Sequence, residues 1–150
     1  MHLEGDYAHS RYQSLISYDL AGRPVQSLAD YLIEPNSGSE NPYRHVANRN
    51  AQNRGFRVDI LNSLPADLGI EGQRLESAAR NELNAPIENG TQILLYRVYL
   101  PDQNTGPTGG VALPEAVVTL EDGTELRGQD ACGAIRAAQP MRLDPGALGI

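Results

Sequence analysis

The chain has no lysine and no tryptophan, and it contains a single cysteine and a single phenylalanine. All twelve basic residues are arginine, so lysine Schiff-base chemistry and a lysine-dependent phosphate loop are excluded. Cys132 cannot form a disulfide within the chain, and no run of about 18 apolar residues is present to span a bilayer. The amino terminus lacks the basic and then apolar pattern of a signal peptide. If the protein is exported, we expect its signal to have been removed or to lie outside this sequence.

Acidic residues outnumber basic ones by 19 to 12, which gives a net charge of −7. This charge repels phosphate backbones, and the arginines are scattered along the sequence, so we expect no nucleic-acid partner. A chain of 150 residues fits one domain and can bury roughly 70% of the surface that its unfolded form exposes. We expect a folded domain over residues 1–138 and a carboxyl-terminal tail over residues 139–150.

Alternating apolar residues and turn dipeptides predict a succession of strands. Expected are strands at 12–18 and 55–61, a turn followed by a short strand within 25–34, a central strand at 91–100 after an Asn89-Gly90 turn, and a hairpin over 115–128. Even spacing of strands, without alternating βαβ units, favours a mainly β fold. We expect a single antiparallel β-sandwich, or jelly-roll-like domain, with one or two short helices.

The segments between these strands differ in character. Residues 35–55 are almost wholly polar, which predicts a long surface loop. Residues 71–84 place Leu75, Ala78, Ala79 and Leu83 at helical spacing, so we expect a helix there. Cys132 is expected in a short helical turn with its thiol packed inward, and the tail after Gln139 is expected to drape on a neighbour.

Catalytic and metal-binding motifs are weak. The three histidines have no metal-ligand spacing, and no G-x-S-x-G motif is present, so we expect no catalytic residue and no cofactor. Asp102 and Asn104 begin like a calcium loop, but the glycine stands one position too early and a proline follows. Calcium at Asp102 and Asn104 is therefore the alternative to a structural turn.

Three further residues are candidates for a ligand or contact surface, together with Asp102 and Asn104. Arg97 interrupts an apolar strand and requires either a buried salt bridge or a ligand. Tyr96 and Tyr43 belong to a set of seven tyrosines whose amphipathic rings suit sugars or partner proteins. The remaining tyrosines are expected to fill the core.

Three strings occur in order: GDYAHSRY, DLAGRPVQSLAD, and YRVYLPD followed by TGGVALP. They match the patterns G-(D/E)-(Y/F)-x-(H/D)-(S/A)-R-Y, D-x-x-G-x-P-x-x-x-L-x-D and YRVY-x-PD…TGGV-x-LP. In this respect about 110 of the 150 residues resemble a group of uncharacterised bacterial proteins that are often predicted to be exported. The chain is similar, more distantly, to a β-sandwich domain of unknown function at the carboxyl end of larger bacterial envelope proteins.

The resemblance implies a β-sandwich, a bacterial source and an extracellular or periplasmic location, and it transfers no catalytic residue. Members of the group continue into a second sandwich-like half after the cysteine-containing segment. This sequence stops near that point, which leaves a truncated chain, a natural half-length version, or a second copy in place of the missing half. A second copy would cover an open sheet edge.

We therefore expect a non-catalytic binding or assembly module of the bacterial cell envelope or exterior, which associates with itself or with another envelope protein. One alternative is a self-assembling structural subunit of an extracellular oligomer or filament. Another is a hydrolase acting on envelope carbohydrate or lipid. The hydrolase requires two carboxylates, or Asp102 with a histidine, to converge in one pocket.

Overall fold

The computed structural model describes residues 1–65, 75–76 and 81–138 of the chain. These residues are mainly β, with 42% in strands and 8% in helix. The elements in chain order are β1 (His2–Asp6), β2 (Ser10–Tyr18), β3 (Pro24–Ala29), the 3-10 turn η1 (Asp30–Leu32), β4 (Gly55–Leu61), β5 (Leu75–Glu76), β6 (Glu82–Asn84), β7 (Ile93–Pro101), β8 (Glu115–Thr119), β9 (Glu125–Arg127) and α1 (Gly128–Ala138).

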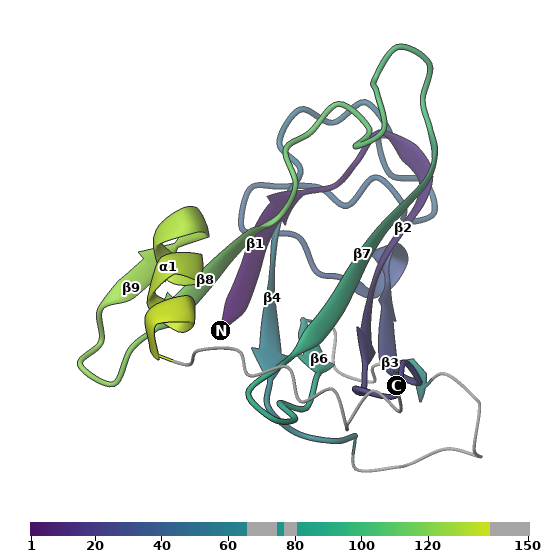
Figure 1. Ribbon diagram of the computed structural model, residues 1–150. Helices are drawn as coiled ribbons and strands as arrows, with labels where there is room; N and C mark the ends of the chain where they lie inside the picture. The colour runs from purple at the N-terminus through teal and green to yellow at the C-terminus, as the bar shows by residue number, and fades with distance from the viewer. Residues whose placement is uncertain (66–74, 77–80, 139–150) are drawn as a thin grey trace.

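The strands form two sheets. One has the order β6-β4-β1-β8-β9 and the other β5-β3-β2-β7. Most neighbours are antiparallel, but the short strands β5 and β6 pair in parallel with β3 and β4. Figure 1 shows the two sheets as separate layers, with α1 packed beside β8 and β9. The expected mainly β sandwich is confirmed, whereas these strand orders do not establish a jelly-roll connectivity.

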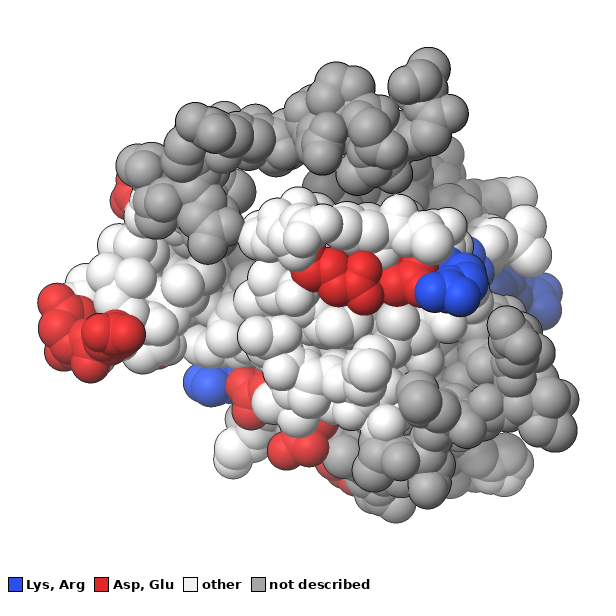
Figure 2. Space-filling model, turned by 60° about the horizontal axis from the view of Figure 1, so that its bottom comes forward, with Lys and Arg blue, Asp and Glu red and all other residues white. Residues whose placement is uncertain are grey.

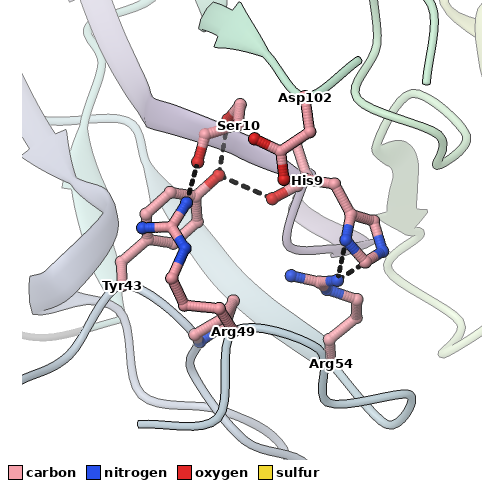
Figure 3. Close-up of a pocket in the computed structure, with 8 residues that line it drawn as sticks. His9, Ser10, Tyr43, Arg49, Arg54 and Asp102 are labelled. Carbon is pink, nitrogen blue, oxygen red and sulfur yellow. Dashed lines mark hydrogen bonds between the residues drawn. The ribbon is translucent and has the colours of Figure 1, made fainter. Parts of the chain in front are cut away.

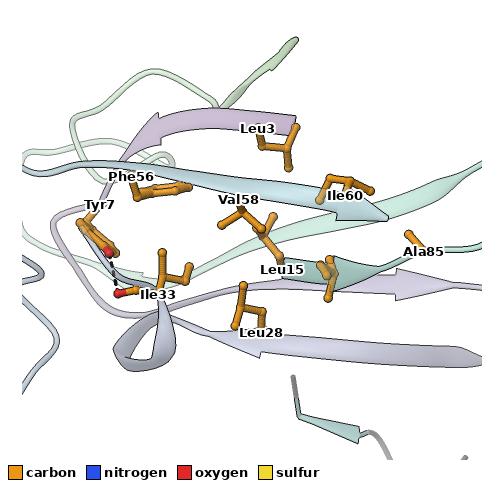
Figure 4. Packing of buried hydrophobic residues seen from close by; sticks show 10 residues of the cluster. Leu3, Tyr7, Leu15, Leu28, Ile33, Phe56, Val58, Ile60 and Ala85 are labelled. Atoms are coloured by element: carbon orange, nitrogen blue, oxygen red, sulfur yellow. Dashed lines mark hydrogen bonds between the residues drawn. The ribbon is translucent and has the colours of Figure 1, made fainter. Parts of the chain in front are cut away.

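The core lies between the two layers (Figure 4). On β4, Phe56, Val58 and Ile60 are buried while Arg57 is exposed, because successive side chains of a strand point to opposite faces. Tyr7 is fully buried among them, and its hydroxyl donates a hydrogen bond of 2.8 Å to the Ile33 carbonyl. That bond satisfies the hydroxyl of a large apolar side chain, so it offsets much of the cost of burying this polar group.

The tight turns form where the sequence predicts them. Asn89 and Gly90 have φ angles of 48° and 73°, and the flanking Glu88 and Thr91 exchange two backbone hydrogen bonds of 2.9 and 2.8 Å. Positive φ at both central residues gives the turn the twist that a two-residue hairpin requires. The strands at 12–18 and 55–61, the 115–128 hairpin and the long 35–55 loop are likewise confirmed.

The expected central position of residues 91–100 is wrong. β7 lies at the end of its sheet and, among the described strands, pairs only with β2. Its apolar residues on both faces suggested burial, but Leu95 is 42% exposed and Tyr99 51% exposed. An apolar edge strand and a central strand have the same composition, so the sequence pattern did not distinguish them.

The expected helix at 71–84 is also wrong where it can be tested. Residues 75–76 and 82–84 are strands β5 and β6, while the rest of that segment lies outside the described residues. Leu83 is fully buried on β6, which pairs with β4, so tertiary pairing outweighs the helical spacing of the sequence. Within 25–34 the order is reversed, because β3 precedes η1.

At the carboxyl end, α1 is longer than the expected helical turn. Its inward side chain is also not the expected Cys132. Ala131 is buried and Cys132 is exposed. The expected tail, residues 139–150, lies outside the described residues. No helix that the structure describes is both long and apolar enough to cross a membrane.

Candidate functional site

A narrow pocket lies where three segments meet at one end of the sandwich: the link between β1 and β2, the 35–54 loop and the start of the β7–β8 loop. Backbone hydrogen bonds join the segments, from Tyr7 N–H to the Arg54 carbonyl (3.0 Å), from His9 N–H to Gly109 (2.8 Å) and from Asp102 N–H to His9 (2.8 Å). The lining residues are Ala8, His9, Ser10, Pro42, Tyr43, Arg49, Arg54 and Asp102 (Figure 3).

Tyr43 forms the floor of the pocket. Its hydroxyl donates to the Ala8 carbonyl at 2.7 Å and lies within hydrogen-bond distance of Ser10 Oγ, at 2.6 Å. Burial raises the pKa of Tyr43 to about 12, so the phenol stays protonated at neutral pH. Tyr43 therefore attaches the 35–54 loop to the start of β2.

A buried carboxylate, Asp30, also raises the pKa of Tyr43 through its charge. Asp30 is 4% exposed, and its two carboxylate oxygens accept backbone N–H bonds from Gln13 (2.8 Å) and Tyr31 (2.6 Å). Burial raises the pKa of Asp30, and the two backbone bonds oppose this effect only in part. Asp30 thus holds β2 and η1 together.

Two arginines of the 35–54 loop line opposite sides of the pocket. Arg49 donates from Nη2 to the Ser10 carbonyl at 2.9 Å, and Arg54 contacts the His9 ring through Nη1. Burial, followed by the charge of Arg54, lowers the pKa of His9, while Asp102 has the opposite, smaller effect. His9 is therefore neutral at pH 7 and can accept a hydrogen bond from Arg54.

Asp102 and His9 do converge in this pocket, which is the arrangement that the hydrolase alternative requires. Their bonding does not match that of a catalytic set. Ser10 Oγ bonds to Tyr43 and to the Tyr12 carbonyl, and the His9 ring bonds to Arg54. Among the described residues, no side-chain hydrogen bond joins the His9 ring to Ser10 Oγ or to the Asp102 carboxylate. A nucleophile needs a base within hydrogen-bond reach, and the described side chains form no such pair here.

The five residues proposed from the sequence fall into separate places. Asp102 and Tyr43 line the pocket, and the Tyr96 hydroxyl lies behind it, 3.4 Å from Gln13 Oε1. Arg97 is half-buried elsewhere on β7 and donates to the Tyr18 hydroxyl at 2.9 Å. No carboxylate of the described residues forms the salt bridge expected for Arg97. Asn104 is exposed in a turn, with a φ of 66°, and does not line the pocket.

His9, Arg49 and Arg54 were missed as site residues. The only sequence signal for the two arginines is their place in a long polar loop, which gives no indication of where the loop folds back. The segments that enclose the pocket are brought together by long-range hydrogen bonds between backbone groups and from the side chains of Tyr43, Arg49 and Arg54.

The calcium interpretation of Asp102 and Asn104 gains no support from the geometry. The Asp102 carbonyl accepts bonds from the Thr105 N–H (3.2 Å) and hydroxyl (2.6 Å), which close a structural turn. Nowhere in the described part of the chain do three His, Cys, Asp or Glu side chains gather closely enough to hold a metal ion.

The outer edge of β7, which pairs with no strand that the structure describes, is a second candidate site. Ile93, Leu95 and Tyr99 alternate along the strand and are exposed, and Leu100 follows at 72% exposure. β7 is nine residues long, whereas the other described edge strands have only two or three. A long apolar edge strand offers unpaired backbone N–H and C=O groups to another strand.

No protein-family model matches this chain, and no significant similarity to a curated protein or to a solved structure was found.

Proposed function

We propose that this chain is a non-catalytic binding or assembly module of the bacterial cell envelope or exterior, and that it assembles by adding a strand to β7. The apolar edge of β7, with which no described strand pairs, is the observation that carries the proposal. The envelope location depends on the motif resemblance alone. Strand addition uses backbone hydrogen bonds for affinity and side-chain contacts for selectivity.

A second copy of the chain is the occupant that suits this edge. The chain has a net charge of −7, yet β7 contains no acidic residue and has Arg97 as its only charge. Two β7 strands therefore bring no acidic side chains of their own against each other. Pairing around a twofold axis also closes the assembly, since each edge then covers the other.

The side chains favour one antiparallel register. With Tyr96 opposite Tyr96 of the second copy, Leu95 lies opposite Arg97 and Ile93 lies opposite Tyr99. A register centred on Arg97 would instead place two like charges directly opposite each other, which is destabilising. The sheet β5-β3-β2-β7 would then continue through β7 into the second copy.

The experiment that tests this proposal compares two substitutions of opposite charge at one position. Sedimentation velocity should give a dimer for the wild type, a monomer for Leu95→Lys and a dimer for Leu95→Glu. In the proposed register, a lysine at position 95 faces Arg97 of the second copy, whereas a glutamate pairs with it. A wild type that stays monomeric at every concentration tested would contradict the proposal.

Leu20→Lys is the matched control for the added charge. Leu20 is 43% exposed, close to the 42% of Leu95, but it lies in the turn between β2 and β3. This variant should dimerise like the wild type. Equal loss of the dimer in Leu20→Lys and Leu95→Lys would show a general charge effect and would count against pairing at β7.

The structural-subunit alternative makes a different prediction about mass. A filament requires a second contact surface, because pairing of β7 around a twofold axis closes at the dimer. Species that grow beyond the dimer with concentration would therefore favour the filament.

The hydrolase remains a second candidate because Asp102 and His9 line one pocket. It predicts that the protein releases reducing sugar from envelope polysaccharide, or fatty acid from phospholipid vesicles, and that His9→Gln abolishes this activity. A wild type that is inactive on both substrates would reject it.

A further inference from the structure

A wider groove lies beside the narrow pocket, and Tyr43 lines both. Its other lining residues are Tyr31 and Leu32 of η1 and Arg44 and His45 of the 35–54 loop. This η1 groove is open to solvent and has a volume of about 590 Å³. Ligand sites commonly enclose roughly 300 to 1,000 Å³, so the η1 groove has room for a small molecule.

Two tyrosine rings and a leucine supply the apolar part of the η1 groove. Tyr31 is 48% exposed, and Leu32 and Tyr43 are half-buried. The Tyr43 hydroxyl is bonded to the Ala8 carbonyl at 2.7 Å, and its ring packs edge-on against the buried Tyr7 ring, with centroids 6.1 Å apart. Because these contacts fix the Tyr43 ring before a ligand arrives, binding costs little side-chain entropy there.

Arg44 is held in place and its charge is balanced. Its Nη1 forms an ion pair with Glu34 at 2.9 Å. Its Nε and Nη2 donate to the backbone carbonyls of Tyr31 and Ile33, each at 3.3 Å. All three guanidinium nitrogens therefore have a partner, and the nearby carboxylate compensates the positive charge. The η1 groove consequently favours an uncharged ligand.

His45 provides hydrogen-bonding groups that its neighbours leave unused. Its ring is exposed, and none of the described residues forms a hydrogen bond or an ion pair with it. The turn that presents His45 is closed by a bond of 3.2 Å from the Ala47 N–H to the Arg44 carbonyl. Val46 in this turn has a φ of 60° and is 93% exposed. A β-branched residue rarely adopts a positive φ, and such strain is found mostly at functional sites.

The backbone beside the groove is not available to a peptide strand. The N–H groups of Tyr31 and Ile33 both donate to Asp30, and their carbonyls both accept from Arg44. Strand addition needs unpaired backbone groups, so recognition in the η1 groove must come from side chains. A pyranose ring suits these side chains, because its apolar C–H face packs on a tyrosine ring while its hydroxyls bond to an imidazole.

We propose that the η1 groove binds a neutral saccharide, with the C–H face of a sugar ring against Tyr31 and its hydroxyls bonded to His45. Tyr43 and Arg44 form fixed walls of the site. The inference goes beyond the assembly proposed for β7, and it depends neither on that dimer nor on hydrolysis of the sugar.

The experiment is an NMR titration of the full chain with three neutral disaccharides: maltose, cellobiose and N,N′-diacetylchitobiose. The side-chain resonances of Tyr31 and His45 should shift with a saturating dependence on at least one of them. The resonances of Tyr99, which is 51% exposed on β7, should not saturate. Acetyl-prolyl-prolyl-proline amide represents a peptide ligand and should saturate, if at all, only at higher concentration than the best disaccharide.

Three variants complete the test. Tyr31→Ala should weaken binding of the best disaccharide by about tenfold, because it removes the ring that the sugar packs on. His45→Ala should also weaken binding. Tyr99→Ala removes a ring of similar exposure outside the groove and should leave the dissociation constant unchanged.

Three results would overturn the proposal. The first is the absence of saturation with all three disaccharides. The second is equal weakening in Tyr31→Ala and Tyr99→Ala, which would indicate unspecific contact with exposed tyrosines. The third is saturation by the proline peptide at lower concentration than any disaccharide, which would assign the groove to a peptide.

Discussion

Individual polar residues inside this protein join segments that are distant in sequence. Asp30 accepts two backbone N–H bonds, Tyr43 connects the 35–54 loop to β2, and Arg54 orients toward His9. None of these roles could be predicted from the residue type, because aspartate and arginine are usually exposed. The sequence proposed Tyr43 and Asp102 as contact residues; both line the pocket, and their contact role stays a prediction.

Asp30 provides a prediction for the pH dependence of stability. Burial raises its pKa in the folded state above the 3.8 expected when unfolded, so the folded state holds the proton more tightly. The contribution of Asp30 to the free energy of unfolding is therefore greatest at pH values below 3.8, the pKa expected when unfolded. This contribution is lost as the pH rises through the folded-state pKa.

Urea unfolding measures this loss of stability with rising pH. The wild type and Asp30→Asn are compared at a series of pH values that starts at roughly 3.5. The free energy of unfolding of the wild type, minus that of Asp30→Asn, should fall as pH rises. The difference removes the opposing contributions of Glu4 and Asp19, whose pKa values are lowered. A difference that rises with pH would mean that the two backbone N–H bonds outweigh burial.

At the scale of elements, local turn chemistry was predictable and strand position was not. The Asn89-Gly90 turn and the 115–128 hairpin depend on neighbouring residues, and both form as expected. The position of β7 at a sheet edge and the β-structure at 82–84 depend on partners elsewhere in the chain. The β7–β8 loop combines both effects, since its glycines permit turns while its contacts are long-range.

Two glycines of this loop give a matched pair of substitutions. Gly109 has a φ of 69°, and an added Cβ would lie 2.8 Å from Ala8 Cβ and 3.0 Å from His9 backbone atoms. Gly106 has a similar φ of 72° but nothing within 4 Å. Gly106→Ala should cost about 1 kcal/mol through backbone strain alone.

Gly109→Ala should cost about 3 kcal/mol, because the clash with the β1–β2 link is added to the strain. Urea unfolding of the two variants gives both values. Equal losses of stability would mean that the contact between the β7–β8 loop and residues 8–9 is loose, and would weaken the description of the pocket.

At the scale of the whole molecule, surface charge and sheet edges together determine how copies can meet. On the face drawn in Figure 2, charged side chains form small groups, in which acidic and basic side chains lie side by side at some places, with uncharged surface between the groups. The net charge of −7 opposes association in general, while the outer edge of β7 contributes no acidic group to that repulsion. The proposed dimer therefore forms against a long-range repulsion that salt can screen.

Association should consequently become stronger as salt is added. Raising the ionic strength from about 0.01 M to about 0.15 M shortens the screening length from about 30 Å to about 8 Å, which weakens repulsion between like-charged copies. Sedimentation velocity of the wild type across this range should show a decreasing dissociation constant of the dimer. A dissociation constant that increases with salt would indicate that attraction between opposite charges holds the copies together.

The sequence by itself determined the mainly β character, the tight turns and the alternating burial of β4, because each follows from residues close together in the chain. It also excluded lysine chemistry and a disulfide within the chain. Only the tertiary structure decided that β7 is an edge strand, that Cys132 points outward and that Arg54, His9 and Asp102 share a pocket. These features depend on contacts between segments that are distant in sequence. Local sequence patterns do not determine which distant segments come into contact.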